Sequence, residues 1–116
     1  AQVTKARGIA VVCAIAPYES SRQYGRRLVE ATGGGFVLVH VATPIEVCEK
    51  RDGTGIYKKA RSGELKNITG VDDPYDVPKQ PDITIDASQV SVREAVHSIV
   101  LHLEAAGYLA SEQAGV

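Results

Sequence analysis

Two uninterrupted apolar runs constrain the fold of this chain most. Residues 9–16, IAVVCAIA, and 36–41, FVLVHV, contain no Asp, Glu, Lys or Arg and show no polar alternation. Such runs are typical of strands that are covered on both faces, as in a parallel sheet. A third, shorter strand is expected over ITID, residues 83–86, after a proline-rich loop. These runs predict a parallel sheet.

The segments between and after these strands have helical patterns. A polar helix is expected from residue 20 or 21 to residue 32, where three glycines end it, and a short one over 45–50 after the capping-box sequence TPIE. Ser91-x-x-Glu94 opens the clearest helix, which Gly107 ends. Strands that alternate with helices predict an α/β layer fold in which ligands bind beyond the carboxyl ends of the strands.

Length and charge exclude several classes of protein. A chain of 116 residues has the size of a single domain, 1–116, and no apolar run reaches the roughly 20 residues that cross a bilayer. The first 16 residues place basic side chains before an apolar run, but Pro17 and Tyr18 follow where a signal cleavage site would lie. The net charge of −1 argues against broad nucleic-acid affinity. Neither a membrane nor a nucleic acid is an expected partner.

The cysteines and histidines give no support for a metal site. Cys13 and Cys48 lie in apolar patterns, where unpaired cysteine is expected to be buried, and a reducing, cytoplasmic setting fits them. No Cys-x-x-Cys or His-x-x-x-His spacing is present. We expect His40, His97 and His102 to be structural or solvated rather than ligands.

A basic, glycine-rich segment follows the second predicted strand. Residues 50–66 carry a net charge of +4, which leaves −5 on the rest of the chain. Glycines flank the short basic run IYKKAR. Phosphoryl transfer needs groups that position the ligand and neutralise charge on oxygens, so a mobile cationic segment suits it. An exposed basic helix on a surface loop would have the same composition, so these features alone leave both interpretations open.

The end of the first predicted strand, AIAPYESSR, is a second candidate site. Pro17 stiffens the exit from the strand, Tyr18 offers a flat face with a hydroxyl group, and Arg22 could meet an anion from the first helical turn. The alternative is a simple strand-to-helix turn with a packing tyrosine.

Three motifs together give the chain a resemblance to a known family. They are Thr-Pro-x-Glu-Val-Cys-Glu, Tyr-Lys-Lys-Ala-Arg-x-Gly-Glu and Thr-Gly-x-x-x-Pro-Tyr. With GIAVVCAIAPY and FVLVHVATPIEVCEKRD they resemble adenylylsulfate kinase over nearly the whole chain, most closely the kinase portion of bacterial bifunctional proteins that also carry sulfate adenylyltransferase. The resemblance implies transfer of the γ-phosphate of ATP to the 3′-hydroxyl of adenylyl sulfate, a lid at about 51–70, and a three-layer, P-loop kinase-like parallel sheet.

The resemblance also implies roles for individual residues. Arg51 corresponds to an arginine that lies against the ATP adenine, and the cationic run of the lid corresponds to Lys58, Lys59 and Arg61, for which we expect a catalytic role. The substrate site implied by the family comprises Ile15, Ala16, Pro17, Tyr18, Thr54, Asn67 and Ile68, to which we add Arg22.

The sequence departs from the family pattern at four of these or adjacent positions. The family usually has serine at Ala16, lysine at Thr54 and phenylalanine at Ile68, and many members carry arginine at Glu19. Alanine at position 16 also occurs in the bifunctional branch. The phenylalanine stacks on the substrate adenine, and such stacking contributes about 1 to 3 kcal/mol. Its loss, with that of the lid lysine, should weaken nucleotide binding.

The largest departure is the absence of Gly-x-x-x-x-Gly-Lys-Ser/Thr, the loop that wraps the phosphates of ATP and positions Mg²⁺. Gly33-Gly34-Gly35 lacks the lysine and follows a helix. In the P-loop kinase architecture the missing strand lies between those matched by residues 9–16 and 36–41. We therefore expect this chain to be the carboxyl-terminal part of the kinase, with ATP and Mg²⁺ bound mainly by the missing half, and inactive alone.

Other interpretations are a degenerate domain that binds a nucleotide and regulates a sulfate adenylyltransferase, and a remnant that binds nothing. Members of the family generally dimerise, so a homodimer is expected, and a sulfate adenylyltransferase is a possible fused or associated partner.

Overall fold

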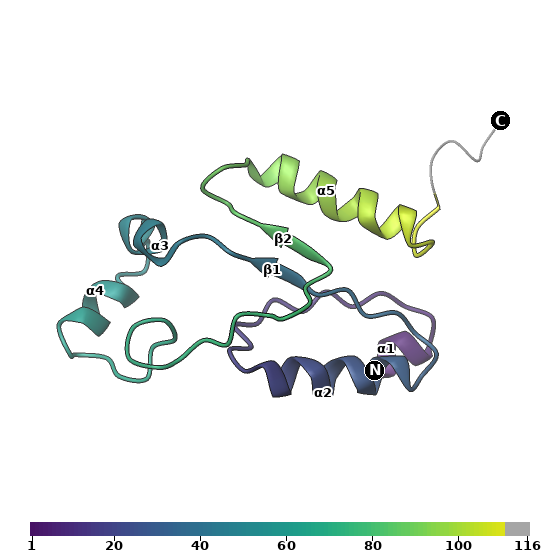
Figure 1. The fold of residues 1–116 in the computed structure, drawn as a ribbon, viewed down its shortest axis with the longest axis horizontal. Helices are drawn as coiled ribbons and strands as arrows, with labels where there is room; N and C mark the ends of the chain where they lie inside the picture. The colour runs from purple at the N-terminus through teal and green to yellow at the C-terminus, as the bar shows by residue number, and fades with distance from the viewer. Residues whose placement is uncertain (111–116) are drawn as a thin grey trace. The chain divides into compact units, whose positions relative to one another are not determined.

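The computed structural model describes residues 1–110, which divide between two compact units. The first unit comprises residues 1–36 and 45–80, and the second comprises 37–44 and the residues from 81 on. In chain order the elements are α1 (Gln2–Lys5), α2 (Glu19–Glu30), β1 (Val39–Val41), α3 (Ile45–Arg51), α4 (Ile56–Arg61), β2 (Ile83–Ile85) and α5 (Val92–Ala105) (Figure 1).

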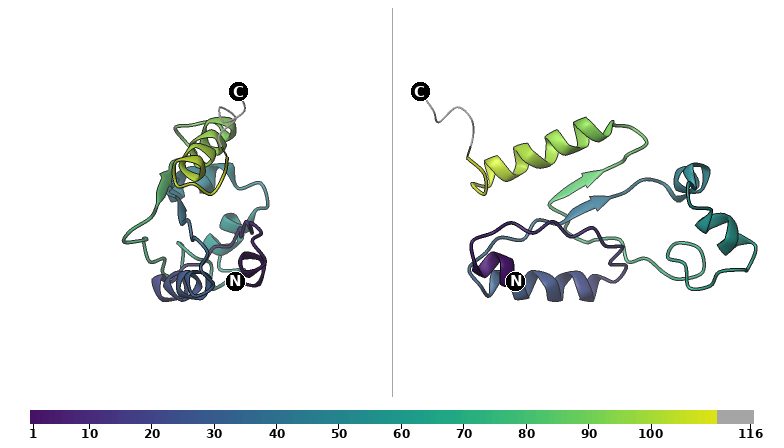
Figure 2. Two further views of the ribbon diagram at one scale, coloured as in Figure 1. Left: turned by 90° about the vertical axis from the view of Figure 1, so that its right-hand side faces the viewer. Right: turned by 180° about the vertical axis from the view of Figure 1, so that it is seen from behind.

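The second unit contains the two strands, which pair in parallel. Val39 lies opposite Ile83 and Val41 lies opposite Ile85. Ile85 is the best-buried apolar side chain among the described residues, at 8% exposure. Helix α5 contacts β2, and the right-hand view of Figure 2 shows it next to the strand pair. The predicted parallel α/β fold is confirmed.

Helix α5 begins with the capping box predicted for it. The Ser91 hydroxyl accepts a bond from the Glu94 N–H at 3.2 Å, and the Glu94 carboxylate accepts one from the Ser91 N–H at 2.7 Å. Two of the N–H groups that a helix leaves unpaired at its start are satisfied in this way. Gly107 follows the helix with φ +78°, a conformation that glycine adopts without a steric penalty.

The strands predicted over 36–41 and 83–86 are both shorter than predicted. The strand expected over 36–41 begins only at Val39, although the Leu38 carbonyl already accepts the Ile83 N–H at 3.1 Å. Side chains bond the backbone ahead of it. The Arg26 guanidinium donates to the Phe36 carbonyl at 3.2 Å, and the Asp82 carboxylate accepts from the Leu38 N–H at 2.7 Å. The predicted strand 83–86 ends at Ile85, since the Asp86 carboxylate instead accepts the Ser88 N–H at 2.8 Å.

The strand predicted over 9–16 does not form. This segment pairs with no strand in the described part of the chain, and its side chains are open to solvent, with Val11 86% and Val12 81% exposed. Cys13, expected to be buried, is exposed, and Cys48 is partly exposed. A strand needs a neighbour to satisfy its backbone groups, and apolar composition alone does not supply one.

The first unit contains four of the helices and both predicted site segments. Helix α2 begins at Glu19, one or two residues earlier than predicted, because the Asp76 carboxylate accepts the Glu19 N–H at 3.0 Å. Helix α1, at the start of the chain, was not predicted. No helix between residues 1 and 110 combines the length and apolar character that a membrane span requires.

Candidate functional site

The turn between the first apolar run and α2 is held in an unusual backbone conformation. Ala16 has φ +42°, in the left-handed region, which costs a residue with a side chain about 1 to 2 kcal/mol. Its carbonyl accepts a bond from the Arg22 guanidinium at 2.7 Å. The next carbonyl, that of Pro17, accepts the Asp76 N–H at 2.8 Å. Two consecutive carbonyls are therefore fixed by groups outside the turn.

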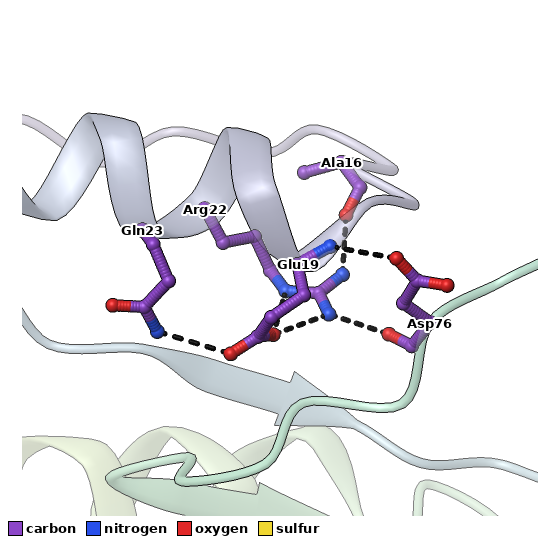
Figure 3. Close-up of polar contacts among 5 residues, drawn as sticks. All are labelled: Ala16, Glu19, Arg22, Gln23 and Asp76. Atoms are coloured by element: carbon purple, nitrogen blue, oxygen red, sulfur yellow. Dashed lines mark hydrogen bonds and ion pairs between the residues drawn. The ribbon is translucent and has the colours of Figure 1, made fainter.

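Arg22 connects this turn to a distant loop. Its side chain is buried, with 6% of the residue exposed, and its guanidinium makes four hydrogen bonds to three residues. Two go to the Glu19 carboxylate at 3.1 and 2.7 Å, one to the Ala16 carbonyl, and one to the Asp76 carbonyl (Figure 3). The guanidinium carbon also lies 5.6 Å from the centre of the Tyr75 ring. Such a geometry needs the planar fork of arginine.

Glu19 is held by the same cluster. Its second carboxylate oxygen accepts a bond from the Gln23 amide at 3.0 Å (Figure 3). The hydrogen bonds from Arg22 and then Gln23 lower the pKa of Glu19 below its usual value. Glu19 also lies in the first turn of α2, where a negative charge is favourable.

The loop that follows the lid contributes a second contact, at Tyr18. The Tyr18 hydroxyl donates to the Asp73 carboxylate at 3.3 Å. The negative charge of Asp73 and this hydrogen bond raise the pKa of Tyr18. The tyrosine is 42% exposed, so its ring is tethered at one end and open to a ligand.

Within the same loop, the side chain of Asp72 bonds to the backbone of residues 67 and 68. The Asp72 carboxylate accepts the N–H groups of Ile68 at 2.7 Å and Asn67 at 2.8 Å, and these bonds lower the pKa of Asp72. Asn67 has φ +60° and Gly70 has φ +83°. The Gly70 N–H donates to the Asp73 carbonyl at 2.8 Å. The predicted substrate residues Asn67 and Ile68 thus lie on a defined turn.

The predicted lid segment, residues 51–70, contains a helix, α4, whose first turn is capped by a side chain that precedes it. Gly55 precedes α4 with φ +71° and has no side chain with which to cap it. The Asp52 carboxylate does so, accepting the N–H groups of Tyr57 at 3.2 Å and Lys58 at 3.0 Å. The segment predicted as a short basic helix is therefore one.

Arg61, at the end of this helix, is paired with α3. Its guanidinium donates to the Glu49 carboxylate at 2.5 and 3.2 Å, and this contact raises the pKa of Arg61. Lys58, Lys59 and Thr54 are exposed on the lid, and Arg51 ends α3.

Two groups of predicted residues thus emerge in the first unit. The substrate group, at 15–18 and 67–68, is brought together through the 72–76 loop, and the lid group surrounds α4. The residues that organise these groups were not predicted. They are Asp72, Asp73 and Asp76 for the first group, and Glu49 and Asp52 for the second. The direct contact predicted between Arg22 and an anion stays a prediction, because its guanidinium bonds protein oxygens here.

The described residues do not by themselves fit a magnesium ion. Between residues 1 and 110, His, Cys, Asp and Glu side chains nowhere gather in threes as metal ligands do. No step of a reaction is therefore assigned through Mg²⁺ on these side chains.

The fold is similar to that of a solved kinase. The structure of APS kinase CysC from Mycobacterium tuberculosis, in complex with AMPPNP and APS, superposes with a TM-score of 0.76 and 37% sequence identity. The match covers 78% of this chain and 52% of that one. Together with the parallel strands and the cationic helix α4, this likeness defines a P-loop kinase fold. The chain belongs to the adenylylsulphate kinase family, whose model matches residues 1–86.

Relatives in fungi are about half identical to this chain over the matched residues. A protein named sulfate adenylyltransferase from Aspergillus terreus is 52% identical over 107 residues, which is 92% of this chain and 19% of that protein. A protein of the same name from Phaeosphaeria nodorum is 53% identical over 109 residues, 94% of this chain and 19% of its own length. The chain thus spans about a fifth of the curated relatives that it matches.

Proposed function

We propose that this chain is the lid and substrate-binding part of an enzyme that phosphorylates adenylyl sulfate. The observation that carries the proposal is the ordered turn at Ala16–Tyr18, joined to the 67–76 loop by the Arg22, Asp73 and Asp76 contacts. These contacts hold the turn and the loop together beside an exposed tyrosine, Tyr18. Family membership supports the assignment of a sulfonucleotide to this turn and loop.

In the proposed reaction the 3′-oxygen of adenylyl sulfate forms a bond to the γ-phosphorus of ATP. The bond from that phosphorus to the β,γ-bridging oxygen breaks, ADP leaves, and the hydroxyl proton passes to water. The product is 3′-phosphoadenylyl sulfate.

The lid residues are assigned to ATP and to the transferred group. Lys58 and Lys59 are exposed on a helix preceded by glycines, so they can reach the equatorial oxygens and offset their charge. Arg61 forms an ion pair with Glu49. It would contact the transferred phosphoryl group either from this position or after the ion pair breaks. Arg51 is assigned to the adenine of ATP. The residues assigned to adenylyl sulfate are Ile15, Ala16, Pro17, Tyr18, Thr54, Asn67 and Ile68.

We further propose that the ATP-binding half comes from sequence outside these 116 residues. The exposed run at 9–16 supports this, because Ile9, Val11, Val12 and Ile15 are 64 to 86% exposed where a paired strand would cover them. Bound Mg²⁺ would then be held mainly by that half. We also propose that the protein forms a homodimer, that it is fused to or associated with a sulfate adenylyltransferase, and that it is located in the cytoplasm.

A coupled assay of the full-length gene product with ATP, Mg²⁺ and adenylyl sulfate tests it. We expect ADP release that depends on adenylyl sulfate. If no ADP is released, calorimetry on the same protein distinguishes a domain that binds adenylyl sulfate from a remnant that binds nothing. Heat on addition of adenylyl sulfate without turnover would favour a binding or regulatory domain, and no heat at millimolar ligand would leave a remnant that binds nothing.

A further inference from the structure

We propose that Arg22 is the positioning residue of the adenylyl sulfate site, acting through the backbone of the Ala16–Tyr18 turn and not through contact with the ligand. This inference rests on the proposed function, and it assigns Arg22 a different role from the direct anion contact that the sequence predicts. The inference is that Arg22 fixes the backbone conformation of the proposed substrate-binding turn.

The donors of Arg22 are directed at protein oxygens. Figure 3 shows the guanidinium between the Glu19 carboxylate, the Ala16 carbonyl and the Asp76 carbonyl. With 6% of the residue exposed and four bonds already made to protein, the guanidinium offers little surface to a bound anion. A charged side chain that is buried and makes four hydrogen bonds to protein in this way organises its surroundings.

The turn needs such a partner because its conformation is unfavourable in isolation. Ala16 has φ +42°, and its carbonyl accepts a bond from the Arg22 guanidinium at 2.7 Å. Strained backbone persists only where surrounding contacts fix it. Without the guanidinium, we expect Ala16 to relax toward negative φ and to turn the Pro17 and Tyr18 backbone away from its present direction.

The same side chain sets the distance between the turn and the loop. Residues 16–22 and 73–76 are more than 50 positions apart in sequence, and they are joined by the bond from Arg22 to Asp76 and by the ring contact with Tyr75. The Glu19 N–H and the Pro17 carbonyl also bond to Asp76, and these bonds require residues 16–22 and 73–76 to lie equally close together. Small displacements of binding groups have large effects on turnover.

The test is Arg22→Lys in the full-length gene product, with Arg27→Lys on the same helix as the matched control. Lysine keeps the charge but loses the planar fork, so it cannot reach all three acceptors. We expect the KM for adenylyl sulfate to rise about tenfold while the KM for ATP stays within about twofold. Arg27→Lys should change neither. A loss of folded protein alone would lower the apparent kcat and leave the KM values for ATP and adenylyl sulfate unchanged, which would overturn the proposal.

Competitive inhibition separates positioning from direct contact. Adenosine carries no anionic group and AMP carries one. If Arg22 positions the turn, Arg22→Lys raises both inhibition constants by the same factor. If it contacts the anion, only the constant for AMP rises, and the proposal fails.

Glu19→Gln provides a milder second variant, should Arg22→Lys not fold. It keeps an oxygen for Arg22 but removes the charge, and we expect the same pattern at about a threefold change in KM. Unchanged values in this variant would also overturn the proposal. Turnover by the unmodified protein tests the proposed function independently of either variant.

Discussion

The carboxylate of Asp52 accepts the backbone N–H of Lys58 at 3.0 Å, which fixes the first turn of the lid helix α4 to the residue that follows α3. Asp52 does the work of a helix cap from a position three residues before Gly55. The cationic run of the lid is therefore held in helical form before any ligand is present. The side chains of Lys58, Lys59 and Arg61 are therefore attached to the helix at fixed spacing.

Asp52→Ala should loosen this helix. Loss of a side-chain cap costs about 1 kcal/mol, which corresponds to roughly fivefold faster amide exchange over residues 57–61. Hydrogen exchange followed by NMR or mass spectrometry measures it. Asp52→Asn, which keeps one acceptor oxygen, serves as the control and should lie between the two. Equal exchange in all three proteins would show that the cap does not stabilise α4.

Lys59→Ala should lower kcat in the full-length gene product by about tenfold or more, because it removes one cation from the lid. Steady-state kinetics at saturating ATP and adenylyl sulfate measure the effect. Lys5→Ala, which removes an exposed lysine outside the lid, is the control and should leave kcat unchanged. A rate unaffected by Lys59→Ala would refute a catalytic role for that residue.

Ile68→Phe should tighten the binding of adenylyl sulfate. The Ile68 N–H is anchored by Asp72 at 2.7 Å, so the backbone that would carry an aromatic ring is already ordered. Stacking on a base contributes about 1 to 3 kcal/mol, so we expect at least a fivefold lower dissociation constant by calorimetry. Ile68→Leu controls for a change of shape without a ring. An equal gain from leucine would contradict stacking.

Gly70→Ala should destabilise the protein more than Gly63→Ala does. Both glycines have a left-handed backbone, with φ +83° and +78°. A Cβ at Gly70 would lie 2.7 Å from the Ile45 Cδ1 atom, whereas one at Gly63 meets nothing within 4 Å. Each variant carries the backbone penalty of about 1 to 2 kcal/mol. Thermal unfolding should show a larger fall for Gly70→Ala, and equal falls would show that the Ile45 side chain moves aside.

The 67–72 turn should open in acid. The pKa of Asp72 is lowered by the N–H groups of Ile68 and Asn67, so its ionised form is the one that the turn prefers. Stabilisation by Asp72 is therefore present above the usual aspartate pKa and is lost as the pH falls through the lowered value. NMR titration of the Ile68 and Asn67 amides should show this transition below pH 4. Asp72→Asn should abolish it, and a transition that persists in that variant would assign it to another group.

Local patterns in the sequence predicted local structure. The capping box of Ser91 and Glu94 is confirmed because both partners lie within one helical turn. The start of α2 was placed too late because its cap, Asp76, comes from 57 positions away. The apolar run at 9–16 was predicted as a strand from composition, but a strand also requires a neighbour, which composition does not encode.

In the candidate site, too, local features were predicted and contacts between distant residues were not. Motifs identified the family, and the lid helix lies where its basic run predicted it. The buried contacts of Arg22 depend on the distant Asp76 backbone, and no local pattern encodes such a contact. Asp72, which accepts the N–H groups of Asn67 and Ile68, occupies an unspecified position of the Thr-Gly-x-x-x-Pro-Tyr motif, so the motif did not single it out.

The uncovered segment between Ile9 and Ile15 has a practical consequence for work with these residues in isolation. VVCAIA lacks charge and proline, and its large apolar side chains are exposed to water. Segments of this kind pair with copies of themselves and stack into cross-β aggregates. We therefore expect precipitation at high concentration to limit any preparation of these 116 residues alone, and co-expression with a chain that covers the segment to relieve it.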